Sequence, residues 1–350
     1  MMNKIPIAIF GATGIVGQRF IQLLQGHPWF EISALVASDR SAGRTYREAC
    51  NWVLEGDPPE SVLDQVVQPL NSDPQAKLVF SALPSSIARE VEPTLAEAGY
   101  IVCSNASAFR QDPDVPVIIP EVNAEHIEMV EGQAAKRGWK GRIVTSPNCT
   151  TTCVVMPLKP LDEDFKVTRV HATSFQAVSG AGYPGLPFID MTDNLIPYIK
   201  GEEEKMEQES LLLLGRMTEG KRVPAELQIS AQANRGPVRY GHTVCLSVEF
   251  ERKPTPKEAV DVLRSYRGPV IARDLPSAPP RPIIVRDEPD RPQPRRDRDT
   301  QGGMVATVGR VRECSVFDLK LVSVIHNAIR GAAGGAVLNA ELLVAGGYLE

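Results

Sequence analysis

A strand, a glycine-rich turn and a helix follow one another at the start of the chain, and this order limits the fold more than any other feature. Residues 5–10, IPIAIF, form an apolar run typical of a buried strand, and residues 15–24, IVGQRFIQLL, place apolar side chains at helical spacing. Gly11, Gly14 and Gly17 fall at the junction of the two. This unit predicts a parallel sheet wound with helices.

The spacing of these glycines, GxxGxxG, suits a dinucleotide site. Gly11 would supply a tight turn, and Gly14 would let the backbone approach a pyrophosphate. The helix N-terminus would offer free N–H donors and a partial positive charge, and the hydroxyl of Thr13 could face the same phosphate. The pattern alone is equally compatible with a strand–helix turn that merely uses glycine.

The loop after the second predicted strand, residues 32–38, bears on the choice between NAD and NADP. An NAD-specific fold usually places an acidic residue there, on the ribose hydroxyls. Here the loop contains Ser38, Arg40 and Ser41, followed by a second arginine, and such side chains suit a 2′-phosphate. Asp39 argues the other way. On balance the loop favours NADP.

The rest of the chain divides into two patterns. Apolar runs at 77–83 and 100–105, separated by an amphipathic helical pattern at 85–99, continue the strand–helix alternation. After residue 148 the character changes, and residues 166–178 and 242–252 are β-branched runs that predict antiparallel strands. The change of pattern places a domain boundary near residue 148.

We therefore predict an α/β fold with two domains, as the length of 350 residues also favours. Residues 1–148 form a Rossmann-type dinucleotide-binding domain, and residues 149–317 an α+β domain with a mixed or antiparallel sheet. Residues 318–350 have a helical pattern and are expected to complete the first domain. The stretch 276–299, rich in proline and charge, is expected to be an extended surface arm.

Composition excludes several classes of protein. The formal net charge is −5, with no basic stripe for a nucleic-acid backbone. No run approaches about 18 apolar residues and no signal-peptide pattern is present, so we expect a soluble, cytoplasmic protein. Few cysteines in a long chain indicate reduced thiols. Those expected to be structural are Cys50, Cys103, Cys153, Cys245 and Cys314.

Cys149 is the strongest candidate for a nucleophile. A proline ends the predicted strand 141–145 shortly before it, so Cys149 is expected to start a helix. Unsatisfied backbone N–H groups at that position are expected to lower the thiol pKa and to stabilise a developing oxyanion. A metal pair with Cys153 is the alternative, but no nearby His or Cys completes a tetrahedral set, so no metal is predicted.

His242 is the strongest of five histidines as a general acid/base. It follows a glycine–proline loop, residues 235–241, at the start of a predicted strand. Loops mounted on a rigid sheet are where catalytic groups concentrate. The sequence pattern alone leaves a simple surface-loop histidine as an equal alternative.

Together these stretches resemble the archaeal and fungal branch of the aspartate-β-semialdehyde dehydrogenases over nearly the whole chain. An ordered set of motifs is more specific than any one of them. The motifs are GATGIVGQ (11–18), SNASAFR (104–110), SPNCTTT (146–152), FQAVSGAG (175–182), GEEEKM (201–206), RGPVRYGH (235–242), RPQPRRDRD (291–299) and HNAIRGAAGG (326–335).

The resemblance implies a role for each matching side chain. The implied catalytic residues are Cys149 as nucleophile, His242 as general acid/base, and Gln176 and Asn148 beside them. The implied substrate-binding residues are Arg235 for a carboxylate, Arg110 and Lys205 for phosphate, and Glu202, the first of three glutamates, for an amino group. With Gly11 and Arg40 from the patterns above, the cofactor contacts are Thr13, Gly14, Ile15, Val16, Ser38, Ser41, Ser179, Gly180 and Asn327.

The resemblance also implies a reaction: reversible, NADP-dependent conversion of aspartyl phosphate to aspartate semialdehyde through a cysteine thioester, on the route to lysine, threonine and methionine. A homodimer or homotetramer built through the second domain is implied as well. Two rivals stay open: a thioester reductase resembling malonyl-CoA reductase, and a non-catalytic NADP-binding sensor. The presence of both Cys149 and His242 argues against the sensor.

Overall fold

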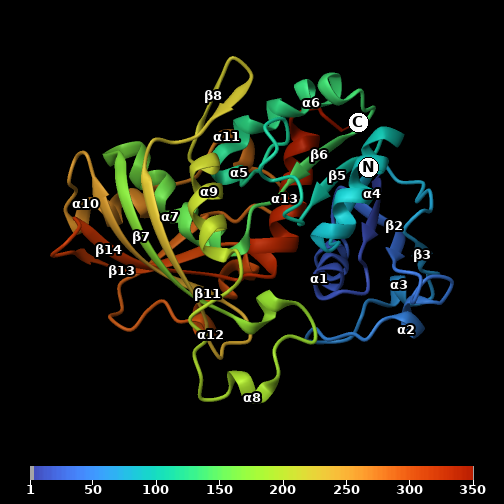
Figure 1. Ribbon diagram of the computed structural model, residues 1–350, viewed down its shortest axis with the longest axis horizontal. Helices are drawn as coiled ribbons and strands as arrows, with labels where there is room; N and C mark the ends of the chain where they lie inside the picture. Colours follow the sequence, from blue (N-terminus) through green and yellow to red (C-terminus); the bar gives the residue numbers. More distant parts are fainter. Residues whose placement is uncertain (1–3, 350) are drawn as a thin grey trace.

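The chain forms two side-by-side units, each built around its own sheet, in a computed structural model that describes residues 4–349. In Figure 1 the N-terminal unit, coloured blue to teal, lies on the right, and the unit coloured green to orange lies on the left. Both ends of the chain lie on the N-terminal unit. Within the described residues, no helix combines the length and apolar character needed to cross a bilayer.

The first sheet is parallel throughout and has the strand order β3-β2-β1-β4-β5-β6. Its central strands are almost wholly buried, which explains their continuous apolar runs. The order reverses between β1 and β4, and ligands of such sheets bind at that switch point, beyond the carboxyl ends of the strands. The strands are β1 (Ile5–Phe10), β2 (Phe30–Ala37), β3 (Gln68–Pro69), β4 (Leu78–Ser81), β5 (Ile101–Ser104) and β6 (Arg142–Thr145).

Helices cover both faces of this sheet, so the predicted Rossmann-type domain is confirmed. Glycine ends α4 and α6 in the left-handed conformation, as expected for a helix C-terminus. The helices are α1 (Ile15–Leu24), α2 (Tyr46–Ala49), α3 (Glu60–Leu63), α4 (Ser85–Ala98), α5 (Pro120–Asn123) and α6 (Met129–Arg137), with a 3₁₀ turn η1 (Ala124–Glu128).

The second sheet is mixed, in the order β10-β7-β11-β14-β13-β12, with parallel pairs only at its two edges. Buried and exposed side chains alternate along β7, since α7 covers one face of the sheet and the other face is open. The strands are β7 (Val167–Gln176), β10 (Gln228–Arg235), β11 (His242–Phe250), β12 (Ile283–Arg286), β13 (Ala306–Glu313) and β14 (Leu319–Ile325), beside a small hairpin of β8 (Arg216–Thr218) and β9 (Lys221–Val223).

Helix α7 connects the two sheets (Figure 1). It begins shortly after β6 ends and packs against one face of the second sheet. The connections around it include several single turns. The remaining elements are α7 (Cys149–Phe165), η2 (Val178–Ala181), α8 (Phe188–Met191), α9 (Glu202–Leu213), α10 (Pro256–Ser265), α11 (Val270–Arg273), α12 (Pro294–Asp297), η3 (Thr300–Gly303), a π-helical turn η4 (Ile329–Ala333) and α13 (Gly334–Ala345).

The C-terminal segment differs from the helical prediction. Residues 319–325 form β14 in the middle of the second sheet, and the chain becomes helical only at η4 and α13. A short apolar run fits a buried strand or a buried helix equally well, and its periodicity could not decide. Helix α13 packs against β4 and β5 and shares the core of the first sheet. Residues 319–325 therefore belong with the second sheet, whereas α13 belongs with the first.

The stretch 276–299 is also more structured than predicted. Residues of β12 pair with β13 at the edge of the second sheet, and Ile283 is buried. The buried carboxylate of Asp297 accepts hydrogen bonds from Arg286, from Arg291 and from the backbone N–H of Gln293. The charges that suggested a solvated arm instead satisfy one another, so the prediction of an extended arm is wrong for these residues.

Candidate active site

Asn148 and Cys149 form the start of α7. The side-chain oxygen of Asn148 accepts the backbone N–H groups of Thr150 and Thr151 at 2.8 and 3.1 Å, which makes Asn148 the N-cap. Cys149 is then the first residue of the helix, as the sequence predicted. The cap fixes the direction in which the thiol leaves the backbone.

His242 lies beside this thiol. It is the first residue of β11, and its Nε2 is 3.1 Å from Cys149 Sγ. Its Nδ1 accepts the backbone N–H of Ala177 at 3.0 Å. Cys153, the alternative metal partner, points its Sγ at Ser323 Oγ and at the carbonyl of His242.

The pKa of the thiol departs from the sequence expectation. Burial, followed by the charge of Glu202, raises the pKa of Cys149 to about 12, whereas Arg110 and Arg235 lower it. Burial, followed by Arg235, lowers the pKa of His242 to about 3. The predicted lowering of the thiol pKa is wrong for this arrangement, because desolvation of a thiolate outweighs the helix N-terminus. The pair therefore rests as a neutral thiol and a neutral imidazole.

Glu202 joins most of the remaining predicted residues. Both oxygens of its carboxylate accept a hydrogen bond from Asn148 Nδ2, each at 3.0 Å. The carboxylate also accepts Gln176 Nε2 at 3.1 Å and Lys205 Nζ at 2.8 Å. The next glutamate, Glu203, turns away and accepts the backbone N–H of Ala233 in β10. Among the three glutamates, the structure thus brings Glu202 to the cysteine.

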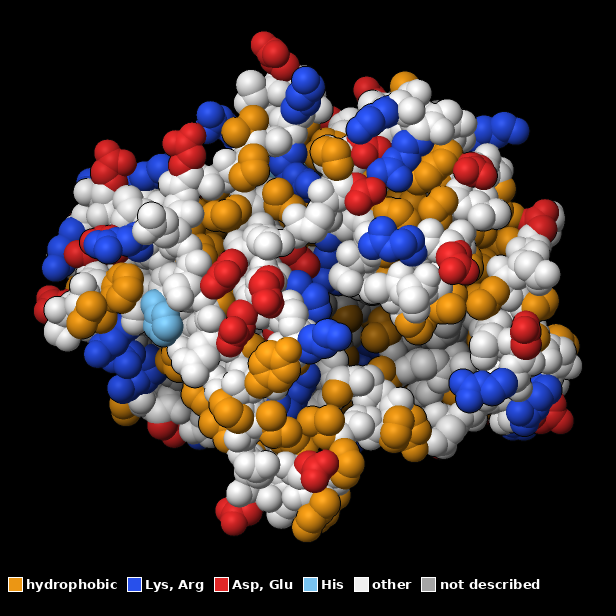
Figure 2. Space-filling model, in the orientation of Figure 1, with side chains coloured by type: hydrophobic (Ala, Val, Ile, Leu, Met, Phe, Trp, Pro, Cys, Tyr) orange, Lys and Arg blue, Asp and Glu red, His pale blue; other side chains and the backbone are white. Residues whose placement is uncertain are grey.

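Two buried arginines complete the surroundings of the thiol. Arg110 donates to Glu209 Oε1 at 3.1 Å and to the carbonyl of Asn105 at 2.8 Å, and Arg235 donates to the carbonyl of Ala177 at 2.8 Å. Figure 2 shows a hollow near the centre of the molecule, with Lys and Arg side chains along its edge. Two buried cations beside the thiol can hold an anionic substrate next to the nucleophile.

The glycine turn has the geometry that a phosphate needs. Gly11 has φ +79°, and a Cβ there would lie 2.7 Å from the carbonyl of Ala82. A Cβ on Gly17 would lie 2.2 Å from the carbonyl oxygen of Gly11, so the helix can approach the strand only without a side chain. Gly14 is the exposed N-cap of α1, and Thr13, Ile15 and Val16 lie around it with their backbone at the helix start.

The loop after β2 presents the predicted 2′-phosphate residues. Ser38 and Arg40 are exposed, whereas Ser41 is largely buried and donates its backbone N–H to the carbonyl of Ser38 at 2.8 Å. The loop is therefore closed by its own backbone, with the arginine side chain free to reach a ligand.

Asn327, Ser179 and Gly180 lie close to His242 and to the loop before it. Asn327 donates to Ser179 Oγ at 2.9 Å and accepts the backbone N–H of Gly241 at 2.9 Å. A Cβ on Gly180 would lie 3.2 Å from His242 Cε1 and 2.8 Å from Arg235 Nη1. These residues hold together the loops that carry the histidine.

The sequence reasoning missed two residues of the site. Glu209 is buried and accepts Arg110 through one oxygen and the backbone N–H of Asn148 through the other, at 2.6 Å. It stands seven residues after Glu202, on the same face of α9, and that spacing is a signal that could have identified it. Gly331, in η4, lies so near Cys149 that a side chain on it would meet the cysteine, a closeness that its motif, residues 326–335, did not indicate.

Gly331 leads to a prediction. A Cβ there would lie 2.7 Å from Cys149 Cβ and 3.0 Å from its Cα, so Gly331→Ala must displace the nucleophile or η4. We expect a fall in kcat together with about 1–3 kcal/mol of lost stability, the usual cost of overpacking. Gly132→Ala is the matched control, because a Cβ on Gly132 in α6 meets no atom within 4 Å. Wild-type kcat in Gly331→Ala would contradict the contact.

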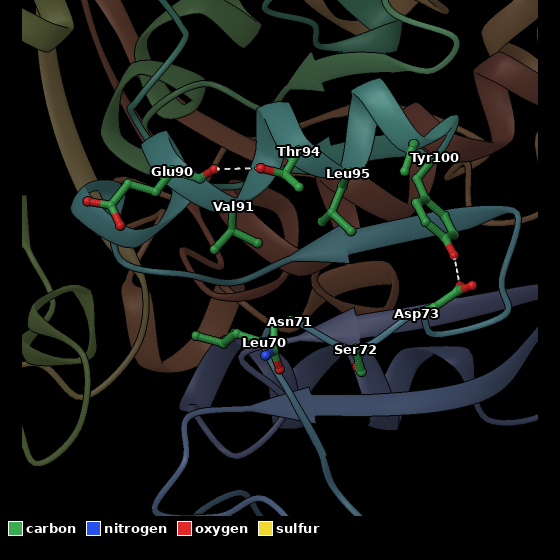
Figure 3. A pocket seen from close by; sticks show the side chains of 10 residues that line it. Leu70, Asn71, Ser72, Asp73, Glu90, Val91, Thr94, Leu95 and Tyr100 are labelled. Carbon is green, nitrogen blue, oxygen red and sulfur yellow. Dashed lines mark hydrogen bonds between the residues drawn. The ribbon is translucent and has the colours of Figure 1, made fainter.

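A cavity of about 460 Å³ lies elsewhere on the first domain (Figure 3). Its walls come from α4 and from the segment after β3, and Tyr100 closes one end against Asp73. None of the predicted site residues lines it, so we assign it no part in the chemistry.

The class of protein to which this two-domain fold and its cysteine–histidine pair belong is shown by two family descriptions, both of semialdehyde dehydrogenases. The family description "Semialdehyde dehydrogenase, NAD binding domain" matches residues 6–130, and "Semialdehyde dehydrogenase, dimerisation domain" matches residues 158–330. Within that class, the chain belongs to the aspartate-semialdehyde dehydrogenase family, because curated proteins of that name are similar to it over nearly their full length.

The relatives include archaeal and fungal proteins. The aspartate-semialdehyde dehydrogenase of Archaeoglobus fulgidus is 50% identical over 97% of this chain and 98% of its own, and that of Candida albicans is 45% identical over 98% and 99%. The crystal structure of the Candida albicans enzyme with NADP matches with a TM-score of 0.91 and 43% identity, covering 99% of this chain and all of that one. The enzyme II of Vibrio cholerae, complexed with ASA, matches at 0.77 and 27%, over 98% of each chain.

Proposed function

We propose that the protein catalyses the reversible, NADP-dependent conversion of L-aspartyl-4-phosphate to L-aspartate-4-semialdehyde through a thioester on Cys149. The observation that carries this proposal is the Cys149–His242 pair, 3.1 Å apart at the first turn of α7. The family membership supports the substrate. In the cell the reaction runs towards the aldehyde and serves the synthesis of lysine, threonine and methionine.

The side chains divide the work as follows, described in the direction of aldehyde oxidation. Cys149 attacks the aldehyde carbon, and His242 serves as the acid/base group beside the sulfur. Gln176 and Asn148, which donate hydrogen bonds to Glu202, orient the substrate and the nucleophile toward each other.

Charged groups hold the substrate itself. Arg235 binds the α-carboxylate, and Glu202 binds the amino group, because each offers the opposite charge beside the thiol. Arg110 and Lys205 hold the phosphate that cleaves the thioester, and Glu209 keeps Arg110 in place. NADP bound at the site would supply the acceptor for the hydride of the reacting carbon.

The first domain fits NADP in two respects. Gly11 and Gly17 leave no room for side chains between β1 and α1, so phosphate can meet the backbone at Thr13, Gly14, Ile15 and Val16. The Candida albicans relative was solved with NADP. We assign the 2′-phosphate to Ser38, Arg40 and Ser41, and the nicotinamide end to Ser179, Gly180 and Asn327.

This cofactor assignment predicts a selective loss. Changing Arg40 and Ser41 together to alanine should weaken NADP binding and leave NAD binding unchanged, since these side chains meet only the 2′-phosphate. Binding of each dinucleotide to the variant and the parent, measured by titration calorimetry, checks it. Arg47→Ala, on the exposed face of α2, is the control. Equal losses with both dinucleotides would mean that the loop positions the adenosine in general.

A thioester reductase that takes coenzyme A esters is the second candidate, because the same thiol chemistry would serve it. The cations around Cys149 favour an acyl phosphate. We predict that oxidation of aspartate semialdehyde with NADP, followed by nicotinamide absorbance, requires inorganic phosphate and that coenzyme A does not replace it. Activity with coenzyme A in phosphate-free buffer would establish the reductase instead.

The same assay tests the phosphate site. Lys205→Ala should raise the KM for phosphate far more than the KM for NADP. Lys205 lies beside Glu202 and is half exposed, so its ammonium group can reach a phosphate ion. Lys200→Ala is the matched control, because Lys200 is exposed and lies two residues before the start of α9. An unchanged phosphate KM in Lys205→Ala would remove the support for this residue.

We also propose a homodimer or homotetramer built through the second domain. The matching family description calls this region a dimerisation domain. Large apolar side chains gather around α8, where Phe188 is 82% and Ile189 80% exposed. Helix α8 lies on the projecting lower part of the molecule in Figure 1, and Figure 2 shows hydrophobic side chains on that part. Such side chains are typical of a surface that a second subunit covers.

A further inference from the structure

The cavity of about 460 Å³ on the first domain has the size of a small-molecule site. In Figure 3 the side chains of Val91 and Leu95 point from α4 toward the segment 70–73, and the ring of Tyr100 closes one end. Together with Leu70, these side chains give the cavity apolar walls. Such walls can bury the apolar body of a ligand.

The polar groups of the cavity favour a cation. None of its lining side chains is basic, and two of them, Asp73 and Glu90, are acidic and lie toward opposite ends (Figure 3). Hydrogen bonds, first that from Tyr100, lower the pKa of Asp73, so its carboxylate is ionised at neutral pH. Ser72 adds a buried hydroxyl oxygen that has no hydrogen-bond partner among the described residues. An ammonium group on a ligand would therefore be attracted here, and a carboxylate repelled.

We propose that this cavity is a regulatory site for a small compound with an apolar body and an ammonium group, and that its occupation strengthens the binding of NADP. The site itself rests on the cavity, whereas the effect on NADP rests on the proposed function. The two walls of the cavity belong to elements that lead to different ligand-binding residues of the enzyme.

The first wall is tied to the loop that we assign to the 2′-phosphate. Strand β3 pairs with the end of β2, and Leu70 follows β3 directly. Just before β3, Val67 donates its backbone N–H to the carbonyl of Arg44 at 2.9 Å and accepts the N–H of Gly43 at 2.8 Å. A ligand that packs on Leu70 therefore holds in place the strand that supports the loop 38–44.

The second wall, helix α4, also holds the segment that carries Arg110. The buried carboxylate of Glu92 accepts Ser104 Oγ at 2.6 Å. From the same helix, Arg89 donates to the carbonyl of Ala108 at 2.9 Å. A ligand in the cavity thus acts on a helix that supports the proposed phosphate site as well.

Occupation should favour the arrangement in which the cavity already exists, because a ligand stabilises the conformation to which it binds. In this arrangement the backbone N–H of Ser41 closes the loop after β2 on the carbonyl of Ser38, and Arg40 is exposed. These side chains can then meet a 2′-phosphate. The ammonium compound and NADP therefore favour the same arrangement, and each strengthens the binding of the other by the same factor.

Titration calorimetry of the full-length protein with tryptamine and with indole-3-propionate tests the site. The two probes share a ring and a chain length and differ in the sign of their charge. We expect tryptamine to bind at least about tenfold more tightly, because the two carboxylates attract its ammonium group and repel the carboxylate. No binding of tryptamine, or equal binding of the two probes, would overturn the proposal.

Two variants test whether tryptamine binds in this cavity. Val91→Phe should abolish binding, because the larger ring fills the space between α4 and the segment 70–73, and a thermal melt shows whether the variant is folded. Glu90→Gln, at an exposed position that does not endanger the fold, should weaken binding by about threefold, the effect of one exposed charge. Glu97→Gln is the matched control on the same helix, because Glu97 is exposed and does not line the cavity. Unchanged binding in folded Val91→Phe or in Glu90→Gln would overturn the assignment.

The coupling is measured as the Kd for NADP with and without saturating tryptamine. We expect tryptamine to lower this Kd by at least about fivefold, the lower end of typical allosteric coupling. An unchanged or raised Kd would overturn the regulatory role. Failure of NADP to bind in the absence of tryptamine would instead contradict the proposed function, so the two failures are distinguishable.

Discussion

Replacing Cys149 by serine is expected to abolish turnover while dinucleotide binding survives. A serine hydroxyl lacks the nucleophilicity of a thiolate, and its alkoxide is far harder to form. The side chain pairs with His242, whereas the phosphates of the cofactor are assigned to the glycine turn and to the loop after β2, so dinucleotide binding should survive. The measurements are kcat with aspartate semialdehyde and phosphate, and the Kd for NADP by titration.

Cys314→Ser is the matched control for this variant. Hydrogen bonds from the backbone, first that of Phe317, lower the pKa of the Cys314 thiol, so it is a more acidic cysteine than most. It lies between β13 and β14, outside the site, and its removal should leave kcat unchanged. Activity of Cys149→Ser within about tenfold of the parent, roughly 1.4 kcal/mol in the barrier, would refute the nucleophile assignment.

His242→Ala should lower kcat by about 10²–10⁴, the range typical of a general acid or base. The loss should be in kcat more than in the KM for NADP, because Nε2 of the ring lies beside the reacting sulfur. His171→Ala is the control, since His171 is exposed on the open face of the second sheet. A loss below about threefold, far under that range, would shift the role to another histidine.

Local signals predicted those parts of the fold that depend on neighbouring residues. The run IPIAIF and the glycines after it indicated β1, its turn and α1. They could do so because a residue's own type limits the backbone conformation at its position. In the same way, the proline before Asn148 and the helical pattern after it indicated the start of α7 at Cys149. The family resemblance then supplied residues, such as Gln176 and Glu202, whose partners lie far away in sequence.

Features set by distant contacts were missed or mistaken. Strand β14 was expected to be helical, because only its pairing with β11 and β13 decides its conformation. Gly331 lies close to Cys149 although 182 positions separate them in the numbering, and its motif, residues 326–335, does not show which residue it meets. The pKa of the Cys149 thiol was predicted to fall, but burial raises it. The sequence does not reveal how deeply the surrounding elements bury this side chain.

The central claim is that a thioester forms on Cys149 before phosphate enters. Mixing the enzyme with aspartate semialdehyde and NADP in phosphate-free buffer tests it directly, with NADPH followed by absorbance and the protein by mass spectrometry. We predict a rapid burst of NADPH equal in amount to the active sites, an aspartyl group added to the peptide that contains Cys149, and its release when phosphate is added. No burst, or a burst that persists in Cys149→Ser, would contradict the account.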